Sequence, residues 1–514
     1  MMEDVRPVLA FCNPATGKQF GEVLMASPEE VRRAMNEMRA AFPTWSAKSI
    51  KERIRILRKF QAVLLDAQDE ITAVLNQDCG KNRQDALIEL FVTVDMLSQY
   101  CSQAPRWLRR RRVSSGLYLF KQCYVDYRPH GVVAVISPWN YPLTLALPPM
   151  LVALLAGNTV ILKPSEVTGA TGVLIQDLIT RVPELAPFVR VVHGDGRVGA
   201  ALIEARPDYI FLTGSTPTGR KVMKAAADYL IPTACELGGK DAMIVLDDAD
   251  IPAAARWGVW GAFFNAGQTC MAVERVYVVE SVYDEFLRQT LAYTEQFKVG
   301  YSSDINESSG FGPVTDPRQV KVIERHLEDA LAKGARILTG GKKHDMFFDP
   351  IVMVDVDHSM DLMRDETFGP IMPIMKVKDE AEAVRLANDN GFGLGGSVWS
   401  RDMDHAWKVA KELQAGSIII NDSIAQFGVP MLPFGGIKDS GFGRIHGEEG
   451  LMQFVRPYSY MVGQPPVKWD IATILREPGH YNLGAAIMHA VFGVTLRQRW
   501  EAIAQLRGER ENKN

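Results

Sequence analysis

Continuous apolar runs separated by polar loops dominate the chain from residue 131 to residue 279. The first two runs, 132–136 and 159–162, lack polar alternation, which is typical of strands buried on both faces of a parallel sheet. A helical pattern at about 145–155 lies between them, so the three elements predict a βαβ unit. Further strands are predicted at 189–192, 209–212, 242–246 and 275–279. Polar loops therefore follow the carboxyl ends of several strands, where open α/β sheets bind ligands.

The flanking regions have different patterns. Ser27, Pro28 and Glu30 predict a helix start, because Ser can cap the helix, Pro suits its first position and Glu can bond back to the cap. Apolar residues at helical spacing follow it, and two more helical patterns span 48–65 and 69–75. Residues 117–128 instead interleave Tyr and Val with polar residues, which predicts an antiparallel hairpin or an edge strand. A strand-like run also occupies 453–462.

Composition narrows the class of protein. A chain of 514 residues predicts two or three domains. The net charge of −4 argues against a nucleic-acid-binding surface. Six scattered cysteines, with no C-x-x-C pair, favour a reducing compartment such as the cytoplasm and predict no metal site. The first five residues do not resemble a signal peptide, and residues 143–155 are too few for a membrane span.

A basic cluster at Arg106 and 109–112 is interpreted first as a solvated face, with contact to anionic lipid headgroups as the alternative.

Several short segments carry candidate chemistry. Residues 263–270 read Phe-Phe-Asn-Ala-Gly-Gln-Thr-Cys. This pattern predicts that an apolar helix ends at Gly267 and that Cys270 lies in the turn before a strand. A thiol there could act as a nucleophile, although most isolated cysteines are inert packing. Residues 213–219 place glycines and hydroxyls at a helix start, which suits a pyrophosphate. Glu166 could accept a bond from a ribose hydroxyl or merely cap a helix, and the usual G-x-G-x-x-G spacing is missing.

Seven motifs occur in one order along the chain. They are Pro138-Trp139-Asn140-Tyr141-Pro142, Lys163-Pro164-Ser165-Glu166, Phe211 with Thr213-Gly214-Ser215, Glu236-Leu237-Gly238-Gly239-Lys240, Gly267-Gln268-Thr269-Cys270, Glu366-Thr367-Phe368-Gly369-Pro370 and Pro433-Phe434-Gly435-Gly436. In this order they closely resemble the NAD(P)-dependent aldehyde dehydrogenase superfamily, over about residues 10–465.

The resemblance implies an α/β subunit of the aldehyde dehydrogenase type. Residues 1–110 and 130–237 would form a Rossmann-type dinucleotide-binding domain, and 238–450 an α/β catalytic domain. Residues 111–129 and 451–465 would form a β-hairpin oligomerisation arm, which implies a homodimer or homotetramer. Residues 466–514 lie beyond the resemblance, and their role stays open.

The resemblance also assigns site residues. Cys270 would be the nucleophile, Glu236 the general base and Asn140 the side-chain donor to the oxyanion. The cofactor-binding set would be Ser137, Trp139, Lys163, Glu166, Gly196, Gly214, Ser215, Gly219, Leu237, Glu366 and Phe368. Within it, Lys163 and Glu166 would bind the adenosine ribose. The Glu166 carboxylate favours NAD because it would repel a 2′-phosphate, and NADP remains an alternative.

These residue types suit oxidation of an aldehyde to a carboxylic acid. A thiolate makes the aldehyde carbon tetrahedral, an amide stabilises the oxyanion without titrating, and a carboxylate can activate the water that releases the acid. Two alternatives stay open: a CoA-acylating relative, against which Glu236 argues, and a silent binding protein on the same fold.

The substrate funnel and the C-terminal extension are less specific. The funnel would include Trp139, Tyr141, Ile424, Phe427, Val429 and Met431, whose apolar character favours aliphatic or aromatic aldehydes. Residues 481–496 are apolar and are followed by Arg497 and Arg499, but they are short for a span. We consider three roles for 481–499: packing on the protein's own dimer, peripheral contact with a membrane surface, or a lid over the funnel.

Overall fold

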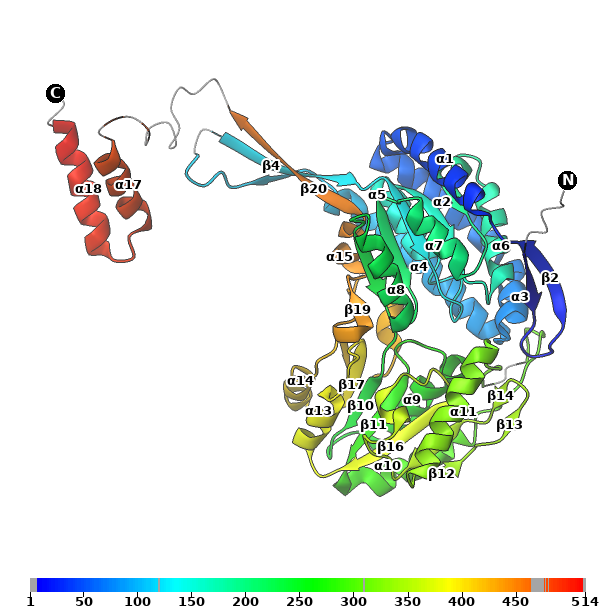
Figure 1. The fold of residues 1–514 in the computed structure, drawn as a ribbon. Coiled ribbons are helices and arrows are strands. Elements are labelled where there is room, and N and C mark those ends of the chain that lie inside the picture. Colours follow the sequence, from blue (N-terminus) through cyan, green and yellow to red (C-terminus); the bar gives the residue numbers. More distant parts are fainter. Residues whose placement is uncertain are drawn as a thin grey trace. The chain divides into compact units, whose positions relative to one another are not determined.

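The computed structural model describes residues 7–118, 121–307, 310–463, 476, 478 and 480–511, with side chains as far as residue 506. The chain forms two compact units (Figure 1). One contains Met1–Trp107 with Pro129–Arg456, and the other contains Leu108–Arg128 with Pro457–Asn514. Residues 1–6, and residues 466–475 of the predicted extension, lie outside the described residues.

The first unit contains a six-stranded sheet built from the predicted βαβ region. Its order is β19-β9-β8-β5-β6-β7, and every neighbouring pair is parallel except β19 with β9. The strands are β5 (Val132–Ile136), β6 (Thr159–Lys163), β7 (Val189–Val191), β8 (Tyr209–Thr213), β9 (Thr233–Glu236) and β19 (Gly441–Phe442). The chain leaves β5 toward one side and later returns to β8 on the other. A ligand crevice is therefore expected beyond the carboxyl ends of β5 and β8.

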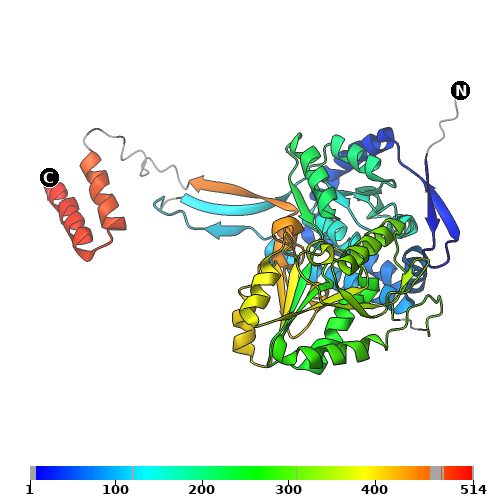
Figure 2. The ribbon, with the colours of Figure 1, turned by 60° about the horizontal axis from the view of Figure 1, so that its bottom comes forward.

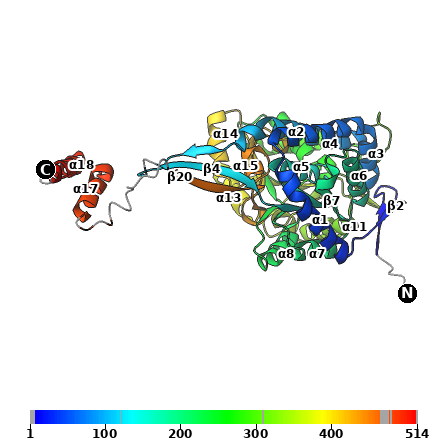
Figure 3. The same ribbon diagram turned by 90° about the horizontal axis from the view of Figure 1, so that it is seen from above.

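Helices cover both faces of this sheet (Figure 3). On one face lie α1 (Pro28–Ser46), α7 (Gly196–Glu204) and α8 (Thr216–Ala227), which share a core with the strands. On the other lie α5 (Leu147–Ala156) and α6 (Gly169–Thr180), backed by α2 (Ile50–Asp66), α3 (Gln68–Cys79) and α4 (Arg83–Trp107). The predicted start of α1 is confirmed, because Ser27 and Glu30 form a complete capping box. The long helix α4 was not predicted from the sequence.

A seven-stranded sheet forms the other half of the first unit. Its order is β12-β15-β16-β11-β10-β17-β18, with only the β12–β15 pair antiparallel. The strands are β10 (Asp241–Val245), β11 (Val273–Val279), β12 (Arg336–Thr339), β15 (Ile351–Val354), β16 (Ile371–Val377), β17 (Gly395–Trp399) and β18 (Ser417–Ile420).

Two apolar cores hold helices against this second sheet. One face carries α9 (Ile251–Phe263) and α10 (Tyr283–Thr294). The other carries α11 (Pro317–Ala332), α13 (Glu380–Asn388) and α14 (Met403–Ala410). Smaller elements are the hairpins β1 (Val8–Cys12) with β2 (Gln19–Leu24) and β13 (Lys343–His344) with β14 (Phe347–Phe348), and the short helices α12 (Asp361–Arg364) and α15 (Gly447–Met452).

The second unit contains a three-stranded sheet in the order β20-β4-β3. It consists of β3 (Arg111–Val113), β4 (Lys121–Pro129) and β20 (Val455–Gly463), at the positions of the two predicted arm segments. β3 and β4 are antiparallel, which confirms the predicted hairpin. In the basic cluster, Arg110 pairs with Asp126, and Arg111 donates to the Tyr127 hydroxyl.

The second unit also contains the helices α17 (Tyr481–Phe492) and α18 (Leu496–Glu511), which lie side by side (Figure 2). In the part of the chain that the structure describes, no helix is both long and apolar enough to cross a membrane.

Candidate active site

Cys270 follows an unusual backbone turn. After α9 ends, Asn265, Ala266 and Gly267 all have positive φ, at 54°, 57° and 71°. A Cβ on Gly267 would lie 2.2 Å from the Gly369 carbonyl oxygen, so only glycine fits there. Gln268 holds the turn, since its side-chain nitrogen donates to the Asn265 carbonyl over 2.9 Å. The half-buried Cys270 is thus presented in a fixed position just before β11.

The loop after β5 is bonded directly to this turn. Asn140 is buried, and its Nδ2 donates to the Gln268 carbonyl oxygen over 3.1 Å. In return, Asn265 Nδ2 donates to the Asn140 carbonyl oxygen over 3.2 Å. An amide nitrogen carries two hydrogens, so Asn140 retains a second donor for a ligand. The predicted oxyanion donor and the predicted nucleophile therefore lie close together.

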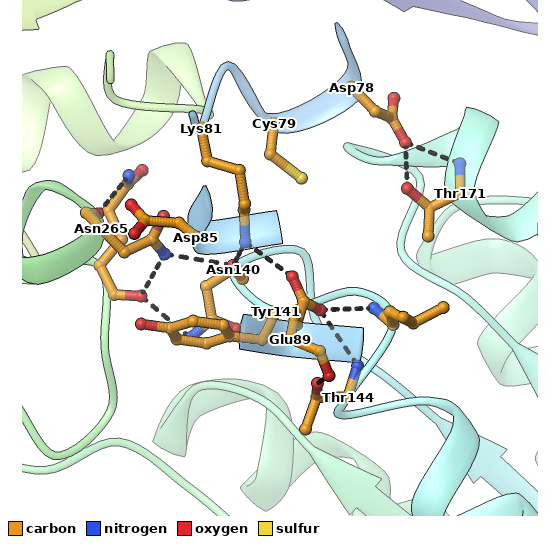
Figure 4. A network of polar contacts seen from close by, with 12 residues as sticks. Asp78, Cys79, Lys81, Asp85, Glu89, Asn140, Tyr141, Thr144, Thr171 and Asn265 are labelled. Carbon is orange, nitrogen blue, oxygen red and sulfur yellow. Dashed lines mark hydrogen bonds and ion pairs between the residues drawn. The ribbon is translucent and has the colours of Figure 1, made fainter. Parts of the chain in front are cut away.

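A buried ion pair fixes the same loop from the side of α4 (Figure 4). Lys81 Nζ lies 2.8 Å from Glu89 Oε1 and donates to the Asn140 carbonyl oxygen over 3.0 Å. Glu89 Oε2 accepts the backbone N–H groups of Leu143 and Thr144, over 2.8 and 3.0 Å. Neither charged residue was predicted from the sequence. The sequence shows only two opposite charges eight residues apart, in a segment without a clear helical pattern, and this does not predict that they pair.

Glu236 ends β9 and is only 4% exposed. Neither carboxyl oxygen has a hydrogen-bond partner among the described residues. Burial raises the Glu236 pKa well above 4.5, against the lowering influence of Arg444. A Cβ on Gly435 would approach Glu236 Oε1 to 2.7 Å, so a glycine leaves room for the carboxyl group. A buried carboxyl group without a partner is costly for stability alone, which points to a functional role.

The segment after Glu236 runs against the Cys270 backbone. A Cβ on Gly239 would lie 2.4 Å from the Cys270 carbonyl oxygen. Burial raises the pKa of the Cys270 thiol, and the nearby carboxylates of Asp241, Glu366 and Glu236 raise it further. The structure therefore brings Cys270, Asn140 and Glu236 together, with the thiol in its neutral form at neutral pH.

Glu366 and Phe368 lie beside this centre. Glu366 Oε1 accepts the Gly239 N–H over 3.1 Å, and burial followed by repulsion from Glu274 raises the Glu366 pKa to about 8. Phe368 has a φ of 51°, and its N–H donates to Glu274 over 2.8 Å. Trp139 packs edge-on against Phe368, with ring centroids 5.4 Å apart.

Lys163 and Glu166 interact at the carboxyl end of β6. Lys163 Nζ is buried and lies 3.6 Å from Glu166 Oε2. The other Glu166 oxygen lies 3.6 Å from a guanidinium nitrogen of Arg318, at the start of α11. Arg318 also pairs with Asp316 over 2.8 Å. The sequence analysis missed Arg318, which is 152 residues away in the chain and belongs to none of the motifs.

The remaining predicted cofactor residues lie around the same strand ends. Ser215 precedes α8, and its hydroxyl bonds to Thr218 Oγ1, so no side chain caps the first turn of that helix. A Cβ on Gly219 would lie 2.8 Å from Leu237, so glycine allows α8 to approach β9 closely. Gly214 donates its N–H to the Glu236 carbonyl, the Ser137 hydroxyl is buried without a partner among the described residues, and Gly196 begins α7.

Together, an uncapped helix start and a buried lysine at a topological switch point fit a dinucleotide.

A cavity of about 250 Å³ opens at Cys270. Its lining is mostly apolar and includes Ile88, Tyr141, Trp260, Phe264, Ile424 and Phe427. The one charged lining residue is Glu89, which Lys81 neutralises. Three of the predicted funnel residues line it, but Trp139, Val429 and Met431 do not. Trp139 does not line the cavity because its ring packs against Phe368 instead.

One protein-family model matches nearly the whole sequence. The model described as the aldehyde dehydrogenase family matches residues 2–459, which is most of the chain. The chain belongs to the aldehyde dehydrogenase family. This confirms the resemblance found in the sequence and the predicted α/β fold class, and it identifies the protein as an enzyme of aldehyde oxidation.

Two curated family members and one solved structure are informative. A 4,4′-diapolycopene aldehyde oxidase from Methylomonas is 42% identical over 454 residues, covering 88% of this chain and 85% of its own length. A protein named as a putative succinate-semialdehyde dehydrogenase [NADP(+)] from Mycobacterium ulcerans is 33% identical, covering 93% of this chain and 96% of its own. A betaine aldehyde dehydrogenase from Staphylococcus aureus, solved with NAD⁺, has a TM-score of 0.85 at 30% identity, covering 90% and 93%.

Proposed function

We propose that this protein oxidises apolar aldehydes to carboxylic acids with NAD or NADP, through a covalent intermediate on Cys270. The observation that carries the proposal is the buried, unpaired carboxyl group of Glu236 beside the Cys270 turn. A base held in this way is suited to accept a proton from water, since burial has raised its pKa above the usual range of a carboxyl group.

The two half-reactions use different proton acceptors. The Cys270 thiol has a raised pKa, so its proton must pass to solvent as the sulfur adds to the aldehyde carbon. The free hydrogen of the Asn140 amide and the Cys270 N–H stabilise the oxyanion that forms. When bound, the nicotinamide accepts the hydride that leaves the substrate carbon. Glu236 then removes a proton from water, which attacks the thioester and releases the acid and the Cys270 sulfur.

The cofactor would occupy the crevice at the carboxyl ends of β5 and β8. Lys163 and Glu166 would hold the adenosine ribose, and Gly214 and Ser215 the pyrophosphate at the uncapped start of α8. Glu366 would take the nicotinamide ribose, with Phe368 against the ring. Ser137, Trp139, Gly196, Gly219 and Leu237 complete the proposed set. The names of the relatives support both cofactors, because one names NADP(+) and another was solved with NAD⁺.

The character of the cavity selects the substrate class. A semialdehyde substrate carries a second, anionic carboxylate, which needs a basic partner when buried. The lining of this cavity contains no Lys or Arg side chain among the described residues, and the charge of Glu89 is already paired with Lys81. An apolar aldehyde fits better, and one relative is named as a 4,4′-diapolycopene aldehyde oxidase.

The proposal is tested by transient kinetics on two variants. Cys270→Ala should abolish NADH formation from hexanal, because no covalent adduct can form. Glu236→Gln should keep the first burst of NADH but slow steady-state turnover by at least 100-fold, since no base activates water. Unchanged steady-state turnover in Glu236→Gln would remove that residue from the role. Acyl-CoA formation on adding CoA would instead favour the acylating alternative.

We also propose that β3, β4 and β20 form the oligomerisation arm of a subunit that has a dinucleotide-binding domain (1–110 and 130–237) and a catalytic domain (238–450). On β20, Tyr458, Met461 and Val462 are all exposed, and the strand is at the edge of its sheet. Exposed apolar side chains on an edge strand favour pairing with a second copy. The scattered cysteines favour a cytoplasmic location for the enzyme.

For α17 and α18 we infer peripheral contact with an anionic membrane surface. Residues 481–496 contain no acidic residue, and Phe492, Leu496 and Trp500 are exposed beside Arg497. Exposed aromatic and aliphatic groups next to arginines suit the headgroup region of an anionic bilayer.

Vesicle flotation tests this contact. The full chain should float with vesicles containing phosphatidylserine but not with phosphatidylcholine alone, and the double variant Phe492→Ser with Trp500→Ser should stay at the bottom. Equal flotation of parent and variant would overturn the contact. A variant that loses its oligomeric state would assign these helices to the dimer instead.

A further inference from the structure

A second hollow adjoins the substrate cavity. It is an open groove of about 870 Å³, and its lining includes Trp257, Trp260, Tyr293 and Phe297. Trp260 and Ala425 line both the groove and the inner cavity, so the two spaces adjoin at these residues. Nothing in the oxidation mechanism itself uses the groove.

The inner cavity alone is small. Its volume of about 250 Å³ holds roughly eight heavy atoms, at ~30 Å³ for each water-sized group. An aldehyde with a longer chain must therefore leave part of that chain outside the cavity. The groove adjoins the cavity at Trp260, so a chain that extends past that residue would reach the groove.

A series of aromatic rings connects the two spaces. The Tyr141 and Phe264 rings are stacked with centroids 6.3 Å apart, and Phe264 and Trp260 are 4.9 Å apart. Trp260 in turn meets Trp257 edge-on at 5.7 Å. Tyr141 lines only the inner cavity, and Trp257 lines only the groove. Aromatic faces in sequence offer a continuous apolar surface to an extended chain.

We propose that the groove at Trp257, Tyr293 and Phe297 is an outer subsite for the distal part of a long, unbranched apolar aldehyde. The inference rests on the proposed function and deepens it. The inner cavity holds the reacting end at Cys270, and the chain beyond about eight heavy atoms lies along the aromatic groove. Trp257 is 40% exposed, so covering it with a hydrocarbon chain removes apolar surface from water.

One competing exit exists. Ile88 lines the inner cavity from α4, and Phe91, three residues further on the same helix, is 71% exposed. A chain leaving on that side would cover Phe91 rather than Trp257. We place the chain in the groove because the groove is hollowed and shares lining residues with the cavity, whereas Phe91 lines neither space.

The test is a chain-length series from butanal to dodecanal, assayed by NADH formation below the solubility limit of each aldehyde. In the parent enzyme, kcat/KM should keep rising beyond octanal, by up to about fourfold for each methylene that leaves water. In Trp257→Ala, and separately in Tyr293→Ala, the ratio of kcat/KM for dodecanal to that for hexanal should fall about tenfold. Trp407→Ala, a change at an exposed tryptophan on α14, is the matched control and should keep the parental ratio.

A parental ratio in both groove variants would overturn the subsite, and so would a loss seen in Phe91→Ala instead. Calorimetric binding of hexanoate and dodecanoate gives a second readout without turnover, in which the preference for dodecanoate should disappear in Trp257→Ala. If the parent does not oxidise hexanal, the proposed function fails, and the calorimetry still decides on the groove. Equal affinities of the parent enzyme for hexanoate and dodecanoate would overturn the outer subsite.

Discussion

The reacting centre contains two acidic groups whose pKa values are raised, so both tend to keep their protons. Burial raises the pKa of both the Glu236 carboxyl group and the Cys270 thiol. A protonated Glu236 cannot accept a proton from water, so the acid-releasing step needs Glu236 in its charged form.

Activity should therefore fall on the acidic side at an unusually high pH. Because the Glu236 pKa is raised above 4.5, the carboxyl group is protonated and inactive below that raised pKa and active above it. The steady-state kcat should thus decline as pH falls through this range, well before an ordinary carboxyl group titrates. A pH profile of kcat measures this acidic decline, and the profile of Glu236→Gln should lack it. An unchanged decline in the variant would assign the titration to another group.

Arg318 changes the expectation for cofactor choice. From the sequence, Glu166 alone would repel a 2′-phosphate, but Arg318 and Lys163 both lie 3.6 Å from its carboxylate and offset that charge. Arg318→Ala should raise the ratio of kcat/KM for NAD to that for NADP by up to about fivefold, a modest effect because the arginine is exposed. Arg325→Ala, on the same helix, is the control, and an equal ratio in both variants would contradict the role of Arg318.

At the scale of elements, α4 supports the loop that carries Asn140. The buried Lys81–Glu89 pair bonds to the Asn140 carbonyl and to two further backbone N–H groups of that loop. A helix that carries none of the reacting groups thereby sets the position of the oxyanion donor.

Breaking this pair should cost both stability and activity. Lys81→Met leaves the Glu89 charge buried and unpaired, which should lower the free energy of unfolding by about 3–5 kcal/mol. The double variant Lys81→Met with Glu89→Leu should recover much of that stability, because no charge is left buried. Its kcat should stay low, since the loop still lacks its partners. Denaturant unfolding and kcat are the measurements, and full recovery of kcat in the double variant would show that the pair only stabilises the fold.

The sequence predicted strands better than it predicted α4, and the reason is physical. Strands such as β5 are buried on both faces, so their apolar runs are uninterrupted. In α4, Glu89 and Thr93 are buried while Phe91 and Leu87 are exposed, so the apolar periodicity is blurred. The motif residues around Cys270 were also readable, because each lies in a short contiguous segment. Arg318 and the Lys81–Glu89 clamp were not, since their partners come from distant parts of the chain.

At the scale of the whole molecule, assembly depends on the second unit. If β20 forms a shared sheet edge, a charge on its exposed apolar side chains should weaken association. Met461, which is 59% exposed, is the most exposed of them. Met461→Lys should therefore shift sedimentation toward smaller species, whereas Met403→Lys, at an exposed methionine on α14, should not. Identical sedimentation of parent and Met461→Lys would argue against the arm.

The chain crosses from one sheet of the first unit to the other at Gly238 and Gly239. Glu236 and Asn140 come from the six-stranded sheet, and Cys270 directly precedes β11 of the seven-stranded sheet. Neither half contains a complete set of reacting groups. Proteolytic cleavage at this crossing would therefore yield two inactive fragments, which would regain turnover only when they reassociate. On heating, activity should accordingly be lost when the two halves separate, at a temperature below the one at which either half unfolds.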